Sequence, residues 1–317
     1  MHSNFSSSFS RLSFNATTGS HRLPFGRNDL DCGGDRGVTE DGRLGTVAVL
    51  RRYPVKSMLG EDLRASDVTW RGLTGDRALA VVHRGTGKVA SAKNPRLWRG
   101  MLKLAATGSG PHVKITLPDG TAITGSDPGI DAVLSGLLGQ PVTLTATPPP
   151  GAVLDRADPE EVLRDGIDAQ ARIEVGRLGD ASPEGTFFDF APLHLITTST
   201  LERIAGLSPR AIIEPERYRP NIVIRATAPG FAENDWAGRD LRIGSDLIIQ
   251  VISRTPRCAI PTLEHGGLPR DGTALRVLAA HNRITPRDDL APQPCAGVYA
   301  QVLRPGRIRL GDIVHLA

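Results

Sequence analysis

From Leu44 onward, short runs rich in apolar and β-branched residues lie between polar segments, which is a strand-like pattern. Turns containing glycine or proline separate many of these runs. The runs cover residues 45–50, 67–70, 77–82, 112–117, 121–124, 221–225, 247–253, 297–303, 308–310 and 313–316. Short strands at this spacing predict a mainly β (α+β) fold with a few helices, built as a barrel or a sandwich.

Helical periodicity is confined to a few segments. Residues 129–138 form the best helix candidate of the first half. In the second half, Ser199-Thr-Leu-Glu202 has the spacing of a capping box and predicts a short helix that ends near Gly206. No apolar run approaches the roughly 18 residues that a membrane-spanning helix needs, so the sequence predicts no membrane span.

Shifts in composition divide the chain. Residues 1–42 lack sustained periodicity and predict a disordered tail; a start codon placed too early and an organellar transit peptide are the alternatives. The clearest boundary lies at residues 148–151, which read Pro-Pro-Pro-Gly. This boundary predicts a first domain over 44–150, a polar linker over 151–185 and a second domain over 186–317.

The overall charge is weakly positive, with 38 Lys and Arg against 34 Asp and Glu. The basic residues are interleaved with acidic ones and aromatics are only 4% of the chain, which argues against nucleic-acid binding. Three cysteines without a CxxC pair exclude a disulfide framework and make a structural zinc site a poor fit. A reducing, cytoplasmic location is therefore expected, with organellar targeting by the tail as the alternative.

Several common catalytic motifs are absent. The chain has no P-loop, no HExxH and no GxSxG, and its GxG at residues 108–110 lacks the third glycine of a dinucleotide-binding loop. These absences remove the usual signatures of nucleotide, metalloprotease and serine-hydrolase chemistry.

Arg254-Thr-Pro-Arg257-Cys258 is the segment most indicative of chemistry. Pro256 ends a strand, which places Cys258 on a loop, and the two arginines favour the thiolate over the thiol. A thiolate suits a soft metal or a persulfide reaction, and a small buried cysteine in a turn is the alternative. Cys295 precedes an apolar strand and is expected to pack in the core, whereas Cys32 in the tail is expected to be inert.

Three further segments place basic residues at predicted strand ends: residues 53–57 (Tyr-Pro-Val-Lys-Ser), 75–77 (Gly-Asp-Arg) and 217–221 (Arg-Tyr-Arg-Pro-Asn). Each can bind an anion, since arginine donates paired hydrogen bonds. Each can equally be a solvated strand end.

Taken in order, these segments resemble the MOSC family, the molybdenum cofactor sulfurase C-terminal domain proteins. The resemblance is to members with an N-terminal MOSC β-barrel domain, as in the mitochondrial amidoxime-reducing component and its bacterial relatives. It implies that 44–150 is that barrel domain and 186–317 the MOSC domain. Further matching positions are Asp189 to Pro192, Trp236, Leu241 to Gly244, Gly297 to Tyr299, Pro305-Gly306 and Gly311-Asp312.

The resemblance implies a bound molybdenum–molybdopterin cofactor, with Cys258 as the protein ligand of molybdenum. The residues that it implies around the pterin and its phosphate are Lys56, Ser57, Arg77, Phe190, Ala191, Arg219, Asn221, Thr255, Arg257, Cys258 and Tyr299. Asp189 is a candidate proton-handling group; orienting a neighbouring loop is its alternative role. Pyridoxal phosphate binding is a further property that the resemblance suggests.

The implied activity is that of a molybdenum oxidoreductase that reduces small N-hydroxylated compounds. The sequence has no flavin motif and no ferredoxin-like cysteine cluster, so electrons are expected from separate donor proteins. Two alternatives stay open. Cys258 can carry a persulfide in a sulfur-carrier or sulfurtransferase protein, or the chain can bind molybdenum cofactor without catalysing a reaction.

Overall fold

The computed structural model describes residues 42–317, so the prediction of a tail at 1–42 lies outside the described residues except for Gly42. The described chain is mainly β with five α-helices and several short 3-10 helices, which confirms the predicted fold class. None of these helices is long and apolar enough to cross a membrane.

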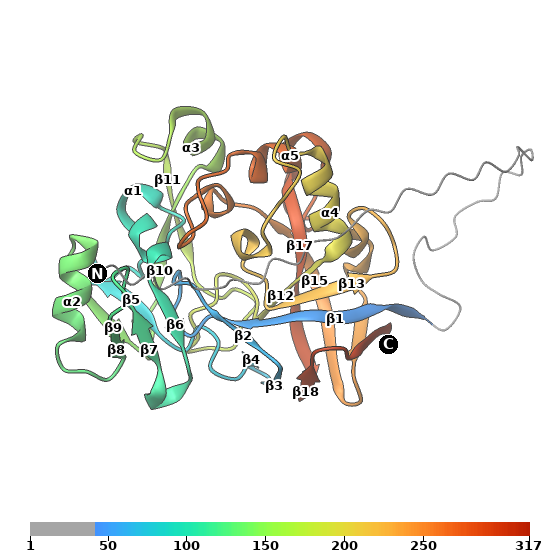
Figure 1. The fold of residues 1–317 in the computed structure, drawn as a ribbon, viewed down its shortest axis with the longest axis horizontal. Coiled ribbons are helices and arrows are strands. Elements are labelled where there is room, and N and C mark those ends of the chain that lie inside the picture. Colours follow the sequence, from blue (N-terminus) through green and yellow to red (C-terminus); the bar gives the residue numbers. More distant parts are fainter. Residues whose placement is uncertain (1–41) are drawn as a thin grey trace, which may run out of the picture. The chain divides into compact units, whose positions relative to one another are not determined.

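Seven strands form a closed barrel, because each is paired on both sides (Figure 1). Only the β12–β13 pair is parallel, and the other six pairs are antiparallel. Around the ring, the strands are β12 (Leu193–Thr197), β13 (Ile222–Ala226), β1 (Arg43–Arg52), β19 (Ile313–Leu316), β14 (Asp240–Ile243), β15 (Leu247–Pro256) and β17 (Gln293–Arg304). The short strands β2 (Glu61–Leu63) and β16 (Arg283–Ile284) extend this sheet beside β1 and β17.

Inward-facing apolar side chains from its strands fill the barrel. On β15, the buried side chains of Leu247, Ile249 and Val251 alternate with more exposed neighbours. They pack with Leu195, Ile224 and other inward-facing residues in one core cluster. Period-two alternation therefore fixes which face of each strand is turned inward.

The first half of the chain contributes one strand to this barrel and otherwise builds small sheets (Figure 1). Its own core gathers residues such as Met58, Met101, Ile115 and Leu134. The elements are β3 (Ala65–Thr69), β4 (Gly72–Leu73), β5 (Ala80–His83), α1 (Pro95–Trp98), β6 (Ala105–Thr107), β7 (Lys114–Thr116), β8 (Ala122–Thr124), α2 (Ile130–Leu138) and β9 (Val142–Thr145). The late strand β18 (Gly306–Arg309) pairs with β3, so the two halves exchange strands in both directions.

The segment 151–185, expected as a polar linker, contains regular structure. It forms the antiparallel pair β10 (Val153–Ala157) and β11 (Ile173–Arg177), with α3 (Pro159–Asp165) between them. Asp158 caps α3 by accepting hydrogen bonds from the backbone N–H groups of Glu160 and Glu161. The segment looks polar because only scattered residues such as Leu154 and Val162 are buried, while most of β11 is exposed.

Two helices lie together outside the barrel, α4 (Thr198–Leu207) and α5 (Thr273–His281). The helix predicted after Ser199 is therefore present, but its cap differs from the prediction. Thr197 accepts the hydrogen bond from the backbone N–H of Thr200, so the helix begins two residues earlier than the capping-box pattern suggests. Helix α5 was not predicted.

Candidate functional site

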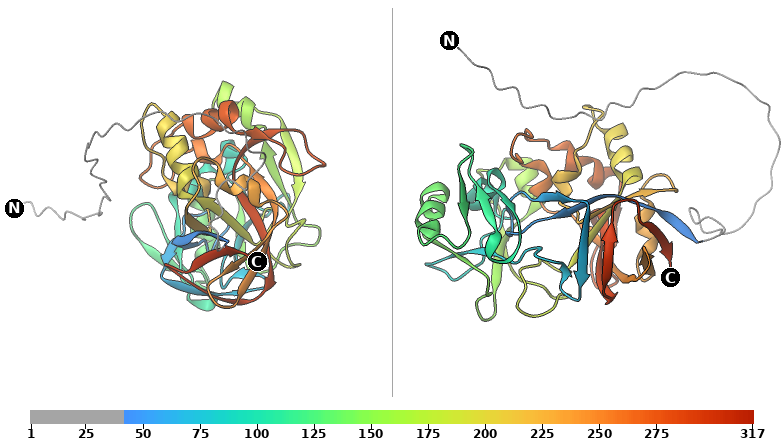
Figure 2. Two further views of the ribbon diagram at one scale, coloured as in Figure 1. Left: turned by 90° about the vertical axis from the view of Figure 1, so that its right-hand side faces the viewer. Right: turned by 60° about the horizontal axis from the view of Figure 1, so that its bottom comes forward.

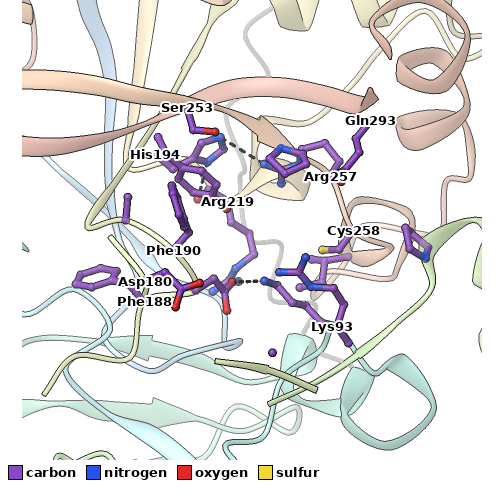
Figure 3. Close-up of a pocket in the computed structure, with 18 of the residues that line it drawn as sticks. Lys93, Asp180, Phe188, Phe190, His194, Arg219, Ser253, Arg257, Cys258 and Gln293 are labelled. Atoms are coloured by element: carbon purple, nitrogen blue, oxygen red, sulfur yellow. Dashed lines mark hydrogen bonds and ion pairs between the residues drawn. The ribbon is translucent and has the colours of Figure 1, made fainter. Parts of the chain in front are cut away.

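A pocket of about 450 Å³ lies where the first half of the chain meets the barrel. Its walls come from the loops after β1 and β5, the hairpin β10–β11, the loop before β12, the start of β13 and the end of β15. This volume is within the range of small-molecule and cofactor sites. Figure 3 shows side chains from these distant segments converging on one space.

Of the residues that the resemblance implies around the cofactor, together with Asp189, all but one line this pocket. Thr255 is the exception: it is fully buried on β15, and its hydroxyl has no hydrogen-bond partner among the described residues. The residues that do line it are Lys56, Ser57, Arg77, Asp189, Phe190, Ala191, Arg219, Asn221, Arg257, Cys258 and Tyr299. The fold thus gathers segments that are far apart in the sequence, and their roles remain predictions.

Arg77 and Arg219 both stack on the ring of Tyr53, with guanidinium-to-centroid distances of 4.5 and 4.3 Å. Both residues have left-handed backbone angles, with φ of 46° and 55°. Nη1 of Arg77 donates to Asp76 at 2.5 Å and to Oδ1 of Asn221 at 3.1 Å. Nδ2 of Asn221 in turn donates to Asp76 at 3.0 Å, so this trio fixes the direction of the Arg77 side chain.

Arg219 and Arg257 carry donors that nothing in residues 42–317 satisfies. Nη1 of Arg219 and Nε of Arg257 are buried without a hydrogen-bond partner there. Burial lowers the pKa of Arg219 to about 10, since no carboxylate is in contact with it to offset the loss of water. Buried, unsatisfied guanidinium groups facing a cavity are suited to an anionic ligand.

Asp189 joins two lysines at the pocket wall. Its Oδ1 accepts from Nζ of Lys56 at 2.5 Å, and its Oδ2 lies 3.1 Å from Nζ of Lys93. Burial alone would raise the pKa of Asp189, but Lys56 and Lys93 hold it well below its usual range. Burial lowers the pKa of Lys56 to about 8 even though Asp189 opposes the shift. The cluster therefore contains an amine that titrates close to neutral pH.

Cys258 is a free, half-buried cysteine two residues after the end of β15, as the loop prediction required. In Figure 3 its side chain lies between those of Arg257 and Lys93. The expected role of Arg254 beside this thiol is wrong. Arg254 does not line the pocket, and its guanidinium donates to the carbonyls of Asn234 at 2.9 Å and Thr285 at 3.3 Å.

No group of three or more His, Cys, Asp and Glu side chains in the described part of the chain is arranged to hold a metal ion. Cys258 is thus the soft protein ligand that this pocket offers. A single protein thiolate leaves the remaining coordination positions of a metal to a cofactor and to substrate.

His194 was not identified from the sequence. It is buried, and burial followed by the charge of Arg257 holds its pKa well below the usual range, so the ring is neutral. Nδ1–H donates to the Arg219 carbonyl at 3.4 Å, which leaves Nε2 to accept from Nη1 of Arg257 at 3.3 Å. A Cβ on Gly297 would lie 2.5 Å from this Nε2, so glycine is needed there for the ring to fit.

Sequence reasoning also missed Lys93 and Arg156. One signal was available: the chain has 5 lysines among its 38 basic residues, and both Lys56 and Lys93 line the pocket. A lysine retained in an arginine-rich chain marks a position where a compact charge with an adjustable pKa is useful. Other pocket residues outside the predicted set include Phe188, Tyr218, Arg177 and Arg287.

Comparisons with known proteins match both halves of the chain. The family model of the MOSC domain matches residues 183–315, and that of the MOSC N-terminal beta barrel domain matches residues 44–133. The chain is 23% identical to mitochondrial amidoxime-reducing component 1 of Mus musculus over 305 residues, and 24% identical to that of Homo sapiens over 310 residues. Each alignment covers 86% of this chain and 83% of the relative.

Solved structures give weaker matches. The YUAD protein from Bacillus subtilis has a TM-score of 0.41 and 10% identity, covering 86% of this chain and 94% of its own. YiiM from Geobacillus stearothermophilus has a TM-score of 0.29 and 16% identity, covering 46% of this chain and 67% of its own. The predicted family resemblance is confirmed by the two domain matches.

Proposed function

We propose that this protein binds molybdenum cofactor in the pocket at Cys258 and reduces N-hydroxylated compounds there. The proposal starts from the two matched domains, a MOSC domain preceded by a MOSC N-terminal β-barrel domain. The observation that carries the proposal is the joint presence, in one cavity, of a half-buried thiol and of buried guanidinium donors without partners. A soft ligand for the metal and a cationic site for a phosphate are what this cofactor requires.

The residues present fit the cofactor. The phosphate of the pterin is a dianion, and Lys56, Arg77, Arg219 and Arg257 supply donors from four different segments. Binding of the phosphate gives the unsatisfied atoms of Arg219 and Arg257 the partner that the protein alone does not provide. Cys258 supplies the thiolate to the metal.

The bound cofactor supplies two-electron redox chemistry at molybdenum. The chain itself supplies binding, exclusion of water and protons. Loss of the oxygen of an N-hydroxylated compound as water consumes two electrons and two protons. The Nζ groups of Lys56 and Lys93, joined through the Asp189 carboxylate, hold protons at the pocket wall. Burial lowers the pKa of Lys93, which eases release of its proton.

The mammalian relatives support the reductase reading, since both are named amidoxime-reducing components. Electrons would come from separate donor proteins, as expected from the sequence.

The test uses full-length protein made in a host that synthesises molybdenum cofactor. Molybdenum and pterin are quantified, and reduction of benzamidoxime is followed with a chemical electron donor. We expect stoichiometric molybdenum and turnover in the wild type. In Cys258→Ser, turnover should vanish while the protein stays folded and part of the pterin remains. Cys295→Ser is the matched control, because Cys295 is buried on β17 and does not line the pocket.

Other outcomes reject the proposal. Full reductase activity in Cys258→Ser would rule out the ligand role. A wild-type protein without molybdenum, but with cyanide-releasable sulfur on Cys258, would favour the sulfur-carrier function. Bound molybdenum cofactor without reduction of any N-hydroxylated compound would leave a binding protein.

A further inference from the structure

The pocket has a second group of cations on its outer wall, apart from those assigned to the cofactor. They are Arg156 on β10, Arg177 at the end of β11 and Arg287 in the loop between β16 and β17. Arg287 pairs with Asp289 at 2.9 Å and stacks over Phe190 at 4.7 Å. The side chains of Arg156 and Arg177 have no hydrogen bond or ion pair with any described residue.

Arg156 is the member of this group whose charge acts on the lysine–carboxylate pair at the pocket wall. It is half-buried, and its charge is felt by the Lys93–Asp189 pair beside Cys258. Burial lowers the pKa of Lys93, Asp189 opposes that change, and Arg156 adds to it. A half-buried guanidinium without a hydrogen bond or ion pair is an arrangement that a bound anion would stabilise.

We propose that Arg156 forms a subsite for a carboxylate on the substrate, so that this pocket takes N-hydroxylated compounds that also bear an acidic group. The inference rests on the proposed function and names its substrate class. The guanidinium of Arg156 can donate two parallel hydrogen bonds to the substrate carboxylate. This contact would orient the N–O group of the substrate toward Cys258.

The β10–β11 hairpin also contains an acidic residue that would repel a substrate carboxylate. Glu174 on β11 lies opposite Arg156 in the strand register and lines the same pocket, yet the two side chains form no ion pair. Glu174 is exposed, so its carboxylate stays in water rather than neutralising Arg156. Its removal should therefore strengthen binding of an acidic substrate, whereas removal of Arg156 should weaken it.

The experiment compares 4-carboxybenzamidoxime with benzamidoxime on cofactor-loaded protein at low salt. We expect the ratio of the two kcat/KM values to be about ten in the wild type, the worth of one half-buried charge-assisted hydrogen bond. Arg156→Gln should bring this ratio close to one, and Glu174→Gln should raise it. Arg172→Gln is the control, because Arg172 pairs with Asp158 and does not line the pocket; it should leave the ratio unchanged.

A binding measurement separates this inference from the reductase function. Calorimetric titration with 4-carboxybenzamide and benzamide should show the same preference for the acid and the same loss in Arg156→Gln. Binding preference without turnover of either amidoxime would support the subsite and reject the reductase. Turnover without any preference for the acid would reject the subsite and keep the reductase. A preference that survives Arg156→Gln would overturn the assignment to this residue.

Discussion

Replacing Arg219 with methionine should make the cofactor-free protein more stable while it destroys cofactor binding. The side chain is buried, its Nη1 has no partner among the described residues, and no carboxylate is in contact with it. Methionine fills similar space without a charge, and any non-glycine residue bears the same backbone cost at the φ of 55° found there. The apolar side chain thus removes an uncompensated buried charge.

The size of the effect follows from the pKa of Arg219 and from its stacking. The fall of this pKa from 12.5 to about 10 corresponds to about 3 kcal/mol against the charged form. Losing the stack on Tyr53, at 4.3 Å, costs about 1–2 kcal/mol. The free energy of unfolding of the cofactor-free protein should therefore rise by about 1–2 kcal/mol, or about 2–5 °C in Tm. The dissociation constant of the pterin should rise about 100-fold with the loss of its charge-assisted contacts.

The assay is thermal unfolding of protein made without the cofactor, paired with titration of the pterin. Arg225→Met is the control, because Arg225 lies on β13 in the same segment but is exposed and does not line the pocket. It should change neither the stability nor the affinity beyond small amounts. A loss of more than about 1 kcal/mol in cofactor-free Arg219→Met would show that the guanidinium is satisfied without a ligand and would refute the reasoning.

Three further outcomes are expected. The pKa of Lys56 is about 8 without ligand, and phosphate binding favours its ammonium form. Pterin affinity should therefore fall as the pH rises from 8 to 10, by up to about tenfold per pH unit. Equal slopes for the wild type and Lys56→Arg would contradict this. Asp189→Asn leaves Lys56 and Lys93 without their shared carboxylate, and urea unfolding should show that the free energy of unfolding falls by about 3 kcal/mol. An unchanged unfolding midpoint would mean that the lysines find other partners. Gly297→Ala places a Cβ 2.4 Å from the carbonyl oxygen of Leu195 and 2.5 Å from Nε2 of His194, at a φ of 79°. It should therefore lower both Tm and pterin content, and full pterin content would show that the strand and the ring relax at little cost.

Local pattern was sufficient for much of the fold. Short apolar, β-branched runs predicted β1, β13, β15 and β17 near their observed positions, since most of the residues in these runs are buried or half-buried. It did not reveal that β1 leaves the first half to join the barrel, because strand partners are set by contacts far apart in the sequence. Scattered burial likewise hid the hairpin in 151–185.

The site was predictable where residues sit next to each other in a motif. Lys56, Arg77, Arg219 and Cys258 were found this way, and the fold brings them into one pocket. Lys93, His194 and Arg156 belong to no such motif. The scarcity of lysine points to Lys93, whereas only tertiary packing reveals His194 and Arg156. Arg254 was misplaced because its guanidinium donates to the carbonyls of Asn234 and Thr285, which are distant in the sequence.

The position of β1 has a consequence for the order of events during synthesis. Its partners, β13 and β19, are made late, and Gly45 pairs with Val314 near the end of the chain. Figure 2 shows the blue strand β1 beside the dark red C-terminal strand. The first half of the chain can pack its own core on the ribosome, but the barrel cannot close until its last strand, β19, has emerged. Until then β1 exposes unpaired backbone groups that another chain can pair with. A fragment cut at the start of the MOSC match would lack this strand altogether and expose the edges of β13 and β19, so the barrel is a property of the entire described chain.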